Sequence, residues 1–247
     1  MEYIPQHPPG EEHLGSVVSS STVPERMKVV DRREFLLNRA RGKKVLHLGC
    51  TDAPYTRQAI AGGTLLHAEL AAVTTELYGM DGDDNGIRML GERGFTDIIH
   101  CDLEALDRLD ARIQPELIIA GEMIEHLNNP GLFLTGIQRF MSLETRLIVT
   151  TVNAYCGMRF LQYGLRGRGG VAEPVHPDHV AYYSYSTLRL ILERHGLQVE
   201  EFLFYDVGKE HRPFNRPVLN LINDICVRIA PQWSDGLIAV CRTSNNE

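Results

Sequence analysis

The chain has 247 residues, of which 43% are apolar, and it carries a formal net charge of −7 with a pI near 5.8. This length and apolar content suit one large domain, and the acidic balance argues against a protein whose main task is to bind a polyanion such as nucleic acid. The five cysteines are widely spread and include no Cys-x-x-Cys pair, so neither a disulfide framework nor a zinc site is indicated.

The start of the chain and its hydropathy predict a cytoplasmic protein without a membrane span. No apolar run reaches the roughly 18 to 20 residues that a membrane helix needs. The first residues, MEYIPQHPPGEEH, hold acids and prolines where a signal peptide has a basic start and an apolar centre. Residues 1–22 are rich in Pro, Gly, Ser and charge, which predicts a flexible tail ahead of a domain over 23–247.

Helical and strand patterns alternate along the rest of the chain. Thr22 to Ala40 has helical spacing of apolar residues, with Thr22 as the N-cap. Further helices are expected from Tyr55 and over 65–76, 85–94, 130–141, 184–195 and 218–229, and strands over 43–50, 77–81, 97–102, 116–122, 145–153, 198–207 and 236–242. Such alternation indicates a parallel sheet covered by helices on both faces. The sequence therefore predicts an α/β, Rossmann-like fold with a seven-stranded, mostly parallel sheet.

Residues 154–183 fit neither a helical nor a strand period. They hold the stretch GLRGRGG and several aromatic residues. A long irregular insertion in a compact α/β domain is more often functional than a plain connector, so we expect a substrate lid here.

Residues that directly follow the strands are the candidates for ligand binding, because open parallel sheets bind ligands at the carboxyl ends of their strands. Gly49 ends the first strand in HLGCTDAP and lets the backbone approach a ligand closely. Asp81 closes the second strand, where a carboxylate can accept hydrogen bonds from both hydroxyls of a ribose. Asp102 closes the third strand, where it can meet the edge of a purine ring.

This series of a glycine loop, two strand-closing acids and a strand that ends in E-x-x-E-H-L-x-x-P resembles the class I methyltransferases that depend on S-adenosylmethionine (SAM). The resemblance covers about Lys44 to Arg242 and implies an antiparallel last strand. A nicotinamide-binding domain would instead need G-x-G-x-x-G after the first strand, which HLGCTDAP lacks. The resemblance implies SAM as cofactor, and the matching or adjacent candidates for binding it are Gly49, Cys50, Thr51, Asp52, Asp81, Gly82, Asp102, Leu103, Gly121 and Glu122.

The first loop departs from the family pattern. His47 stands where the family commonly has an acid, and Thr51 and Ala53 stand where it has further glycines. A histidine inside a strand is more often a core residue than a ligand, so we expect His47 to be buried in the core. Asp52 offers a carboxylate that can pair with the ammonium group of SAM.

The stretch GEMIEHLNNP places Glu122, Glu125 and His126 just past an apolar strand. On a helix, the two carboxylates would share one face with the imidazole adjacent to it. Charges held this closely favour a bound divalent cation. His176 and His179, in the stretch VHPDHVAYYS, are candidates for a fourth ligand.

The same combination resembles two branches of the class I family, the small-RNA 3′-terminal 2′-O-methyltransferases and the polyprenyl-polyhydroxybenzene O-methyltransferases of the ubiquinone pathway. The resemblance implies a metal set of Glu122, Glu125, His126 and His179 that holds Mg²⁺ or Mn²⁺, with His126 and Glu125 as the catalytic residues. Many class I methyltransferases carry a similar segment without a metal, with Glu125 and His126 in hydrogen bonds behind the site and Leu127 beneath the cofactor. Both interpretations stay open on the sequence.

The expected lid suggests the kind of acceptor. Its arginines Arg159, Arg166 and Arg168 can hold the phosphates of a nucleotide sugar or lipid-linked glycan. Tyr182, Tyr183 and Tyr185 either line an acceptor pocket or serve packing. The stretch over 176–197 resembles bacterial methyltransferases of polysaccharide and secondary-metabolite pathways.

The leading hypothesis is O-methylation by SAM of a sugar, glycan or other polyhydroxylated small molecule. An RNA 2′-O-methyltransferase is one alternative, although the chain is acidic and has no added RNA-binding domain. A SAM-binding regulatory protein without catalysis is another, motivated by the altered first loop. The sequence gives no indication of an oligomeric state.

Overall fold

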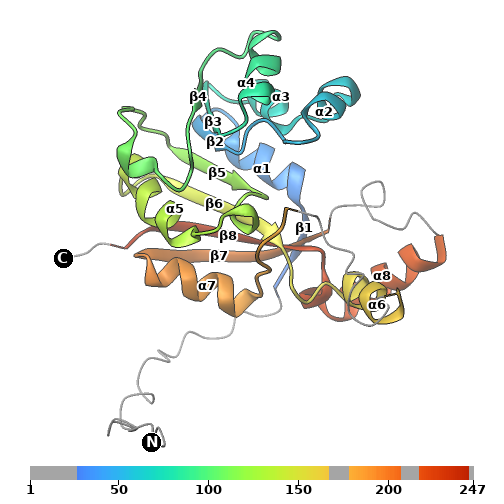
Figure 1. Ribbon diagram of the computed structural model, residues 1–247. Helices are drawn as coiled ribbons and strands as arrows, with labels where there is room; N and C mark the ends of the chain where they lie inside the picture. Colours follow the sequence, from blue (N-terminus) through green and yellow to red (C-terminus); the bar gives the residue numbers. More distant parts are fainter. Residues whose placement is uncertain (1–26, 167–177, 207–216, 245–247) are drawn as a thin grey trace, which may run out of the picture.

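The computed structural model describes residues 27–166, 178–206 and 217–244 (Figure 1). Its centre is an eight-stranded sheet in the order β1-β7-β8-β6-β5-β2-β3-β4. Only β8 runs antiparallel to its neighbours, β6 and β7. The strands are β1 (Val29–Asp31), β2 (Lys44–Leu48), β3 (Glu76–Asp81), β4 (Ile98–His100), β5 (Leu117–Gly121), β6 (Arg146–Val152), β7 (Leu197–Asp206) and β8 (Gly236–Thr243). The predicted α/β, Rossmann-like fold is confirmed, with one strand more than expected.

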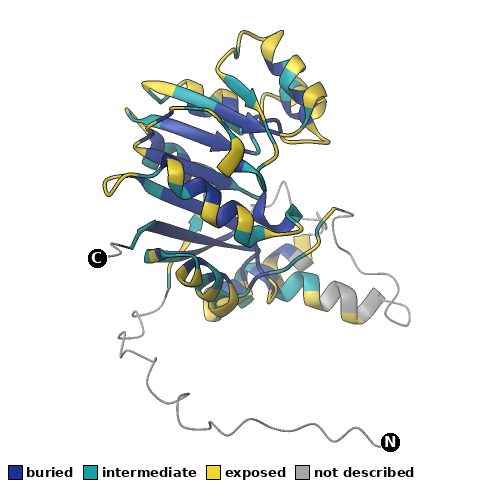
Figure 2. Ribbon diagram, turned by 60° about the vertical axis from the view of Figure 1, so that its left-hand side comes forward, coloured by how far each residue is buried: buried dark blue, intermediate teal, exposed yellow. Residues whose placement is uncertain are grey.

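Helices cover both faces of this sheet. They are α1 (Arg32–Ala40), α2 (Thr56–Gly62), α3 (Leu66–Ala71), α4 (Asp84–Gly91), α5 (Pro130–Ile137), α6 (Gly157–Arg166), α7 (Tyr185–Arg194) and α8 (Pro217–Ile229). One core cluster joins α5 and α7 to the sheet, and a second joins α1 and α3 to its other face. Figure 2 shows the central strands as the most buried part of the molecule.

The central strands are apolar along their whole length because both of their faces are covered. In β5, Ile118 packs into the cluster with α5 and α7, whereas Leu117 and Ile119 pack into the cluster with α1 and α3. This alternation follows the two-residue period of a strand. It also leaves the carboxyl ends of the strands as the place where polar residues can gather.

A helix was expected from Thr22 to Ala40, and this prediction is wrong over residues 27–31. Val29 and Val30 belong to β1, which adds to the sheet edge by parallel pairing with β7. The helix begins only at Arg32, and Asp31 caps it by accepting a hydrogen bond from the amide of Glu34 at 2.8 Å. Two β-branched residues suit a strand when an edge is available to pair with. Thr22 lies outside the described residues.

The lid region is more regular than expected. Residues 157–166 form α6, so this part of 154–183 is helical and not an irregular insertion. Residues 167–177, with Arg168 and His176, lie outside the described residues. The lid role and the domain limits at 23–247 stay predictions. In the described part of the chain, no helix is long and apolar enough to cross a bilayer.

Two buried histidines meet beneath the first loop. As predicted, His47 lies in the core, 3% exposed, and its Nδ1 is 3.2 Å from Nδ1 of His67, which is 2% exposed. The rings stack with their centroids 5.4 Å apart. Burial lowers the pKa of His67 to about 4 and lowers that of His47 well below its ordinary value. Both rings are therefore neutral at physiological pH.

This burial makes stability sensitive to acid. Because the pKa of His67 is about 4 in the folded chain and about 6.5 in an unfolded chain, only the unfolded state binds the proton between these values. Stability is fully present above pH 6.5 and falls as pH drops toward 4, by on the order of 2 to 3 kcal/mol for this ring. We expect His67→Gln to reduce the fall in Tm between about pH 7 and pH 4.5. Exposed His100 is the matched control, and equal slopes for wild type and His67→Gln would contradict this prediction.

Candidate active site

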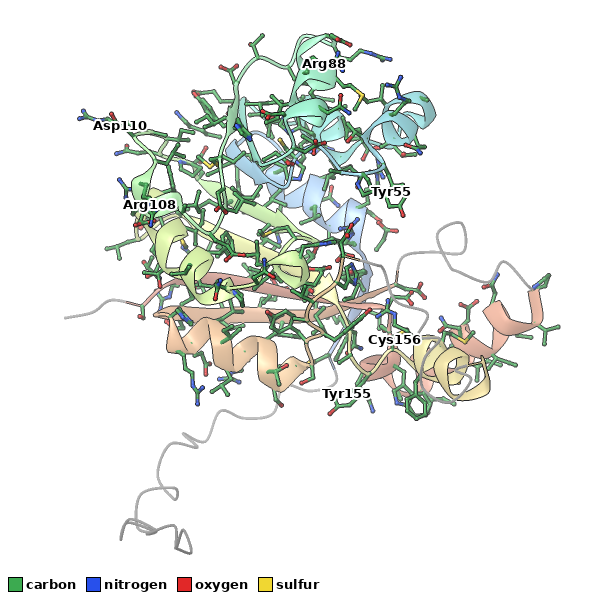
Figure 3. The ribbon with its side chains drawn as sticks, viewed as in Figure 1. Tyr55, Arg88, Arg108, Asp110, Tyr155 and Cys156 are labelled. Carbon is green, nitrogen blue, oxygen red and sulfur yellow. The ribbon has the colours of Figure 1, made fainter. Side chains whose placement is uncertain are left out.

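The carboxyl ends of the central strands open into a cleft of about 1020 Å³, and Tyr55, labelled in Figure 3, lies on its lining. Seven of the ten residues expected to bind the cofactor line this cleft, whereas Thr51, Gly82 and Asp102 do not. The seven are Gly49, Cys50, Asp52, Asp81, Leu103, Gly121 and Glu122. The structure thus gathers most of the predicted set from four separate strand ends.

Gly49 turns the chain sharply at the end of β2. Its φ is +66°, a conformation that side chains with a Cβ rarely adopt. A Cβ at this position would also lie 3.3 Å from Cβ of Met123. The absence of a side chain therefore keeps the first loop close to the segment that follows β5.

Asp81 is held by the first loop in addition to facing the cleft. Its Oδ2 accepts hydrogen bonds from the amide and the hydroxyl of Thr51, both at 2.9 Å, and its Oδ1 accepts one from the amide of Asp83 at 2.9 Å. Thr51 therefore fixes the position of the Asp81 carboxylate. Asp102 is exposed and accepts a hydrogen bond from the amide of Glu104 at 2.8 Å.

Arg32, at the start of α1, is a cleft residue that the sequence analysis missed, because its helical pattern gave no sign that this end of the helix reaches the strand ends. Its Nη1 lies 3.9 Å from Oε1 of Glu122, and its guanidinium lies over the ring of Tyr205 at 5.7 Å. Burial opposes the charge of Arg32, but Glu122, Tyr205, Glu125 and Asp52 together outweigh it, and the pKa of Arg32 is raised. Burial also raises the pKa of Asp52, and the charge of Arg32 opposes that shift.

Glu122 turns away from the helix face on which the sequence had placed it. Its φ is +54°, and its amide donates to the carbonyl of Thr150 at 3.0 Å. Its Oε1 accepts a hydrogen bond from the hydroxyl of Tyr205. The ring of Tyr205 is fully buried against Gly236, where any Cβ would overlap it. Burial first, and then the charge of Glu122, raise the pKa of Tyr205 well above its ordinary value.

The helix expected to carry both glutamates is a single 3₁₀ turn, Ile124–His126, which begins after Glu122. The prediction that Glu122 and Glu125 share one helix face is wrong, because the left-handed backbone at Glu122 separates the two side chains. Glu122 points toward Arg32 and Tyr205. Glu125 points toward β6, where its Oε2 accepts a hydrogen bond from the hydroxyl of Thr151 at 2.8 Å.

Glu125, His126 and His179 form a compact cluster, with one possible ligand atom from each lying within 4.8 Å of the others. The rings of His126 and His179 meet edge to face, with centroids 4.7 Å apart. The carbonyl of Glu125 accepts the amide of Val180 at 2.9 Å, which fixes the segment carrying His179. Three of the four predicted metal ligands are therefore together, and Glu122 lies outside this cluster.

Glu125 is fully buried, and its Oε1 has no hydrogen-bond partner among the described residues. Burial, with a smaller contribution from the charge of Glu122, raises the pKa of Glu125 to about 8. An ionised carboxylate with an unsatisfied oxygen is costly in such a place. The residue must therefore stay protonated at neutral pH or gain a cation.

The aromatic residues of the expected lid divide between packing and the site. Tyr183, 6% exposed, belongs to the core, and Tyr185 packs on Phe202 with ring centroids 4.6 Å apart. Tyr182 lies beside His179, with ring centroids 5.7 Å apart, and under the guanidinium of Arg159. The side chain of Arg166 lies outside the described part of the structure, as does Arg168.

A family model described as a methyltransferase domain matches residues 22–201. The chain belongs to this methyltransferase family. No curated protein matches this chain.

Solved structures share the fold of this methyltransferase at low sequence identity. A SAM-dependent methyltransferase from Archaeoglobus fulgidus is 16% identical with a TM-score of 0.52, over 85% of this chain and 94% of that one. A putative methyltransferase from Bacillus halodurans is 12% identical with a TM-score of 0.54, over 87% and 99%. An N-methyltransferase from Bradyrhizobium japonicum, in complex with S-adenosyl-L-homocysteine, is 16% identical with a TM-score of 0.51, over 85% of each chain.

The hydrogen bond between Tyr205 and Glu122 should stabilise the methyltransferase measurably. We expect Tyr205→Phe to lower the free energy of unfolding by about 1.5 to 3 kcal/mol, because a buried hydroxyl that binds a carboxylate is lost. Tyr78→Phe is the matched control, since the hydroxyl of Tyr78 donates to Glu76 at the surface at 3.0 Å. Urea unfolding of the control should change by less than about 0.5 kcal/mol. Equal losses in both variants would argue against a special role for the buried pair.

Proposed function

We propose that this methyltransferase transfers the methyl group of SAM to a hydroxyl oxygen of a sugar, glycan or other polyhydroxylated small molecule, with a divalent cation held by Glu125, His126 and His179. The observation that carries the proposal is the cluster of these three side chains at the cleft, with a buried carboxylate oxygen that has no hydrogen-bond partner among the described residues. His126 and His179 both line the cleft.

The shape and charges of the cleft support SAM as the cofactor. A volume of about 1020 Å³ lies at the upper end of the range for small-molecule sites, which leaves room for a cofactor and an acceptor. Asp81 and Leu103 suit the nucleoside end of SAM. Asp52 suits its ammonium group, and Arg32 suits its carboxylate, because each side chain offers the opposite charge on the lining of the cleft.

The ligand cluster suits a cation that accepts nitrogen donors. Glu125 contributes a carboxylate oxygen, and His126 and His179 contribute imidazole nitrogens. Mg²⁺ prefers an oxygen-rich set, whereas two imidazoles with one carboxylate suit transition metals. With Glu122 outside the cluster, we favour Mn²⁺ over Mg²⁺. Such a cation, when bound, would lower the pKa of a hydroxyl on the acceptor.

When His126 binds the cation, its other ring nitrogen carries a hydrogen, so a neighbouring water would accept the proton of the acceptor hydroxyl. Without a cation, His126 is the residue that we propose to accept this proton. It lines the cleft, whereas Glu125 lies behind it and is fully buried. Imidazole is the side chain that most often transfers protons near neutral pH. Glu125 then holds and orients the cluster, and Thr151 fixes one of its oxygens.

The acidic lining of the cleft favours a small polyhydroxylated acceptor over RNA. Asp31, Asp52, Glu122 and Asp206 all face it, and a lining of this kind repels a phosphate backbone. Sugars offer neutral vicinal hydroxyls that can meet both a cation and carboxylate acceptors. This lining supports the acceptor class expected from the sequence, a sugar, glycan or other polyhydroxylated small molecule.

Calorimetry on chelator-treated protein tests the proposal as a whole. Titration with S-adenosylhomocysteine should give a binding isotherm, and later addition of Mn²⁺ should give a second one, stronger than that of Mg²⁺. We expect His179→Ala to lose at least tenfold in Mn²⁺ affinity and to keep nucleoside binding. Glu122→Gln is the control, because its side chain lies outside the ligand cluster.

The outcomes of this titration separate the parts of the proposal. Nucleoside binding without a Mn²⁺ isotherm would remove the cation and leave His126 to act alone. Equal loss of Mn²⁺ affinity in Glu122→Gln would move the metal to another ligand set. No binding of S-adenosylhomocysteine would overturn SAM as the cofactor.

Asp52 provides a test of the cofactor orientation alone. We expect Asp52→Asn to weaken S-adenosylhomocysteine binding about tenfold or more, because a charge-assisted contact with the ammonium group is lost. Exposed Asp84, which does not line the cleft, gives the matched control Asp84→Asn. A lower calorimetric affinity in Asp52→Asn than in Asp84→Asn, with both melting temperatures unchanged, would support the assignment. Equal affinities in wild type and Asp52→Asn would refute it.

A further inference from the structure

Helix α8 presents apolar side chains to solvent and buries polar ones. Its exposed residues recur at helical spacing along one face and are Val218, Leu221, Ile222, Ile225 and Ile229, which are 41 to 72% exposed. On the protected side, Asn220 and Asn223 are 7% and 3% exposed, and Asn223 donates to Asp206 at 3.5 Å. A helix of a soluble domain normally has the reverse orientation.

Helix α6 lies beside α8 and extends this apolar surface (Figure 1). Phe160 on α6 is 73% exposed, and Tyr155, labelled in Figure 3 just ahead of α6, is 66% exposed. A groove of about 460 Å³ runs between the helices and is bordered by Trp233. We call this surface the α6/α8 face, and it comprises Tyr155, Phe160, Val218, Leu221, Ile222, Ile225, Ile229 and Trp233. Apolar residues gathered in this way mark an interaction site.

The α6/α8 face lies at the same edge of the sheet as the cleft. Helix α6 follows the carboxyl end of β6, and α8 follows that of β7. Both strands run antiparallel to β8 and hence parallel to each other. Asp206, the last residue of β7, lines the cleft and accepts the hydrogen bond from Asn223 on α8. Asp206 therefore connects helix α8 to the cleft.

The stretches of sequence that contain and adjoin α6 and α8 are basic in an otherwise acidic chain. Residues 157–177 and 207–229 together contain seven Lys and Arg and three Asp and Glu, whereas the whole chain contains 25 against 32. Anionic lipid headgroups attract basic segments that flank an apolar helix. A second copy of this chain, docked by two-fold symmetry, would instead bring like charges together. The charge favours a lipid surface as the occupant.

We propose that the α6/α8 face docks the protein onto an anionic lipid bilayer. The apolar side of α8 would lie at the boundary between headgroups and acyl chains, and its asparagines would stay against the protein. This is shallow attachment and involves no spanning helix. The family model matches residues 22–201, so α8 lies beyond the part of the chain that it describes. If the proposed function holds, the acceptor would reach the cleft from the membrane side, as a lipid-linked hydroxyl compound does.

The single tryptophan of the chain, Trp233, allows a direct test because it lies at the border of the groove. Full-length protein is mixed with vesicles of equal parts phosphatidylcholine and phosphatidylglycerol, and with vesicles of phosphatidylcholine alone. We expect a blue shift of Trp233 emission and co-sedimentation with the anionic vesicles, both weakened by high salt.

Paired variants place the contact on the α6/α8 face. The double variant L221Q/I225Q should lose at least tenfold in vesicle partitioning, because it puts polar groups in the centre of the apolar face. The control is L132Q/L143Q, whose leucines are 56% and 61% exposed outside this face, and it should partition like wild type. Melting temperatures equal to that of wild type verify that both variants are folded.

Two results would overturn the proposal. One is the absence of both the emission shift and co-sedimentation with anionic vesicles. The other is a dimer in sedimentation velocity that L221Q/I225Q converts to a monomer, which would make the face an interface between copies of the chain. Vesicle binding by a protein that does not bind S-adenosylhomocysteine would refute the proposed function and leave the docking surface intact.

Discussion

Two carboxylates at the end of a fully buried strand are the constraint on which this structure depends. Glu122 and Glu125 follow the apolar strand β5, where water cannot fully solvate them. The fold compensates these two carboxyl groups in different ways. Glu122 is compensated by Arg32 and by the hydroxyl of Tyr205, whereas Glu125 has one bonded oxygen and one without a hydrogen-bond partner among the described residues.

Because of this difference, Glu122 serves the stability of the fold, whereas Glu125 is the residue of the proposed chemistry. The partners of Glu122 come from α1, which follows β1, and from β7, so this carboxylate ties one end of the sheet to its middle. The incomplete bonding of Glu125 is what a ligand cluster needs, because a fully satisfied carboxylate has no reason to bind a cation. The proposed chemistry thus rests on the member of the pair that the fold leaves unsatisfied.

The sequence predicted whatever depends on local pattern. Apolar runs placed β2, β3, β4, β5 and β6, and residues at or after the ends of these strands placed part of the cleft lining, including Gly49, Asp81 and Leu103. It could not predict β1, because that strand exists only by pairing with β7 far along the chain. It likewise missed Arg32 and the backbone reversal at Glu122, since both depend on Tyr205 and Thr150, which local spacing does not relate to them.

The contact between Tyr205 and Gly236 links the site to the order of chain synthesis. Gly236 is the first residue of β8, and the ring of Tyr205 fills the space that any side chain there would need. Slipping β8 by one residue would put Leu237 against that ring, so this single contact selects the register of the inserted strand. The carboxylate of Glu122 therefore gains its buried partner only after the last strand has entered the sheet, and a nascent chain that lacks residues beyond 235 has every cleft residue but not the assembled cleft.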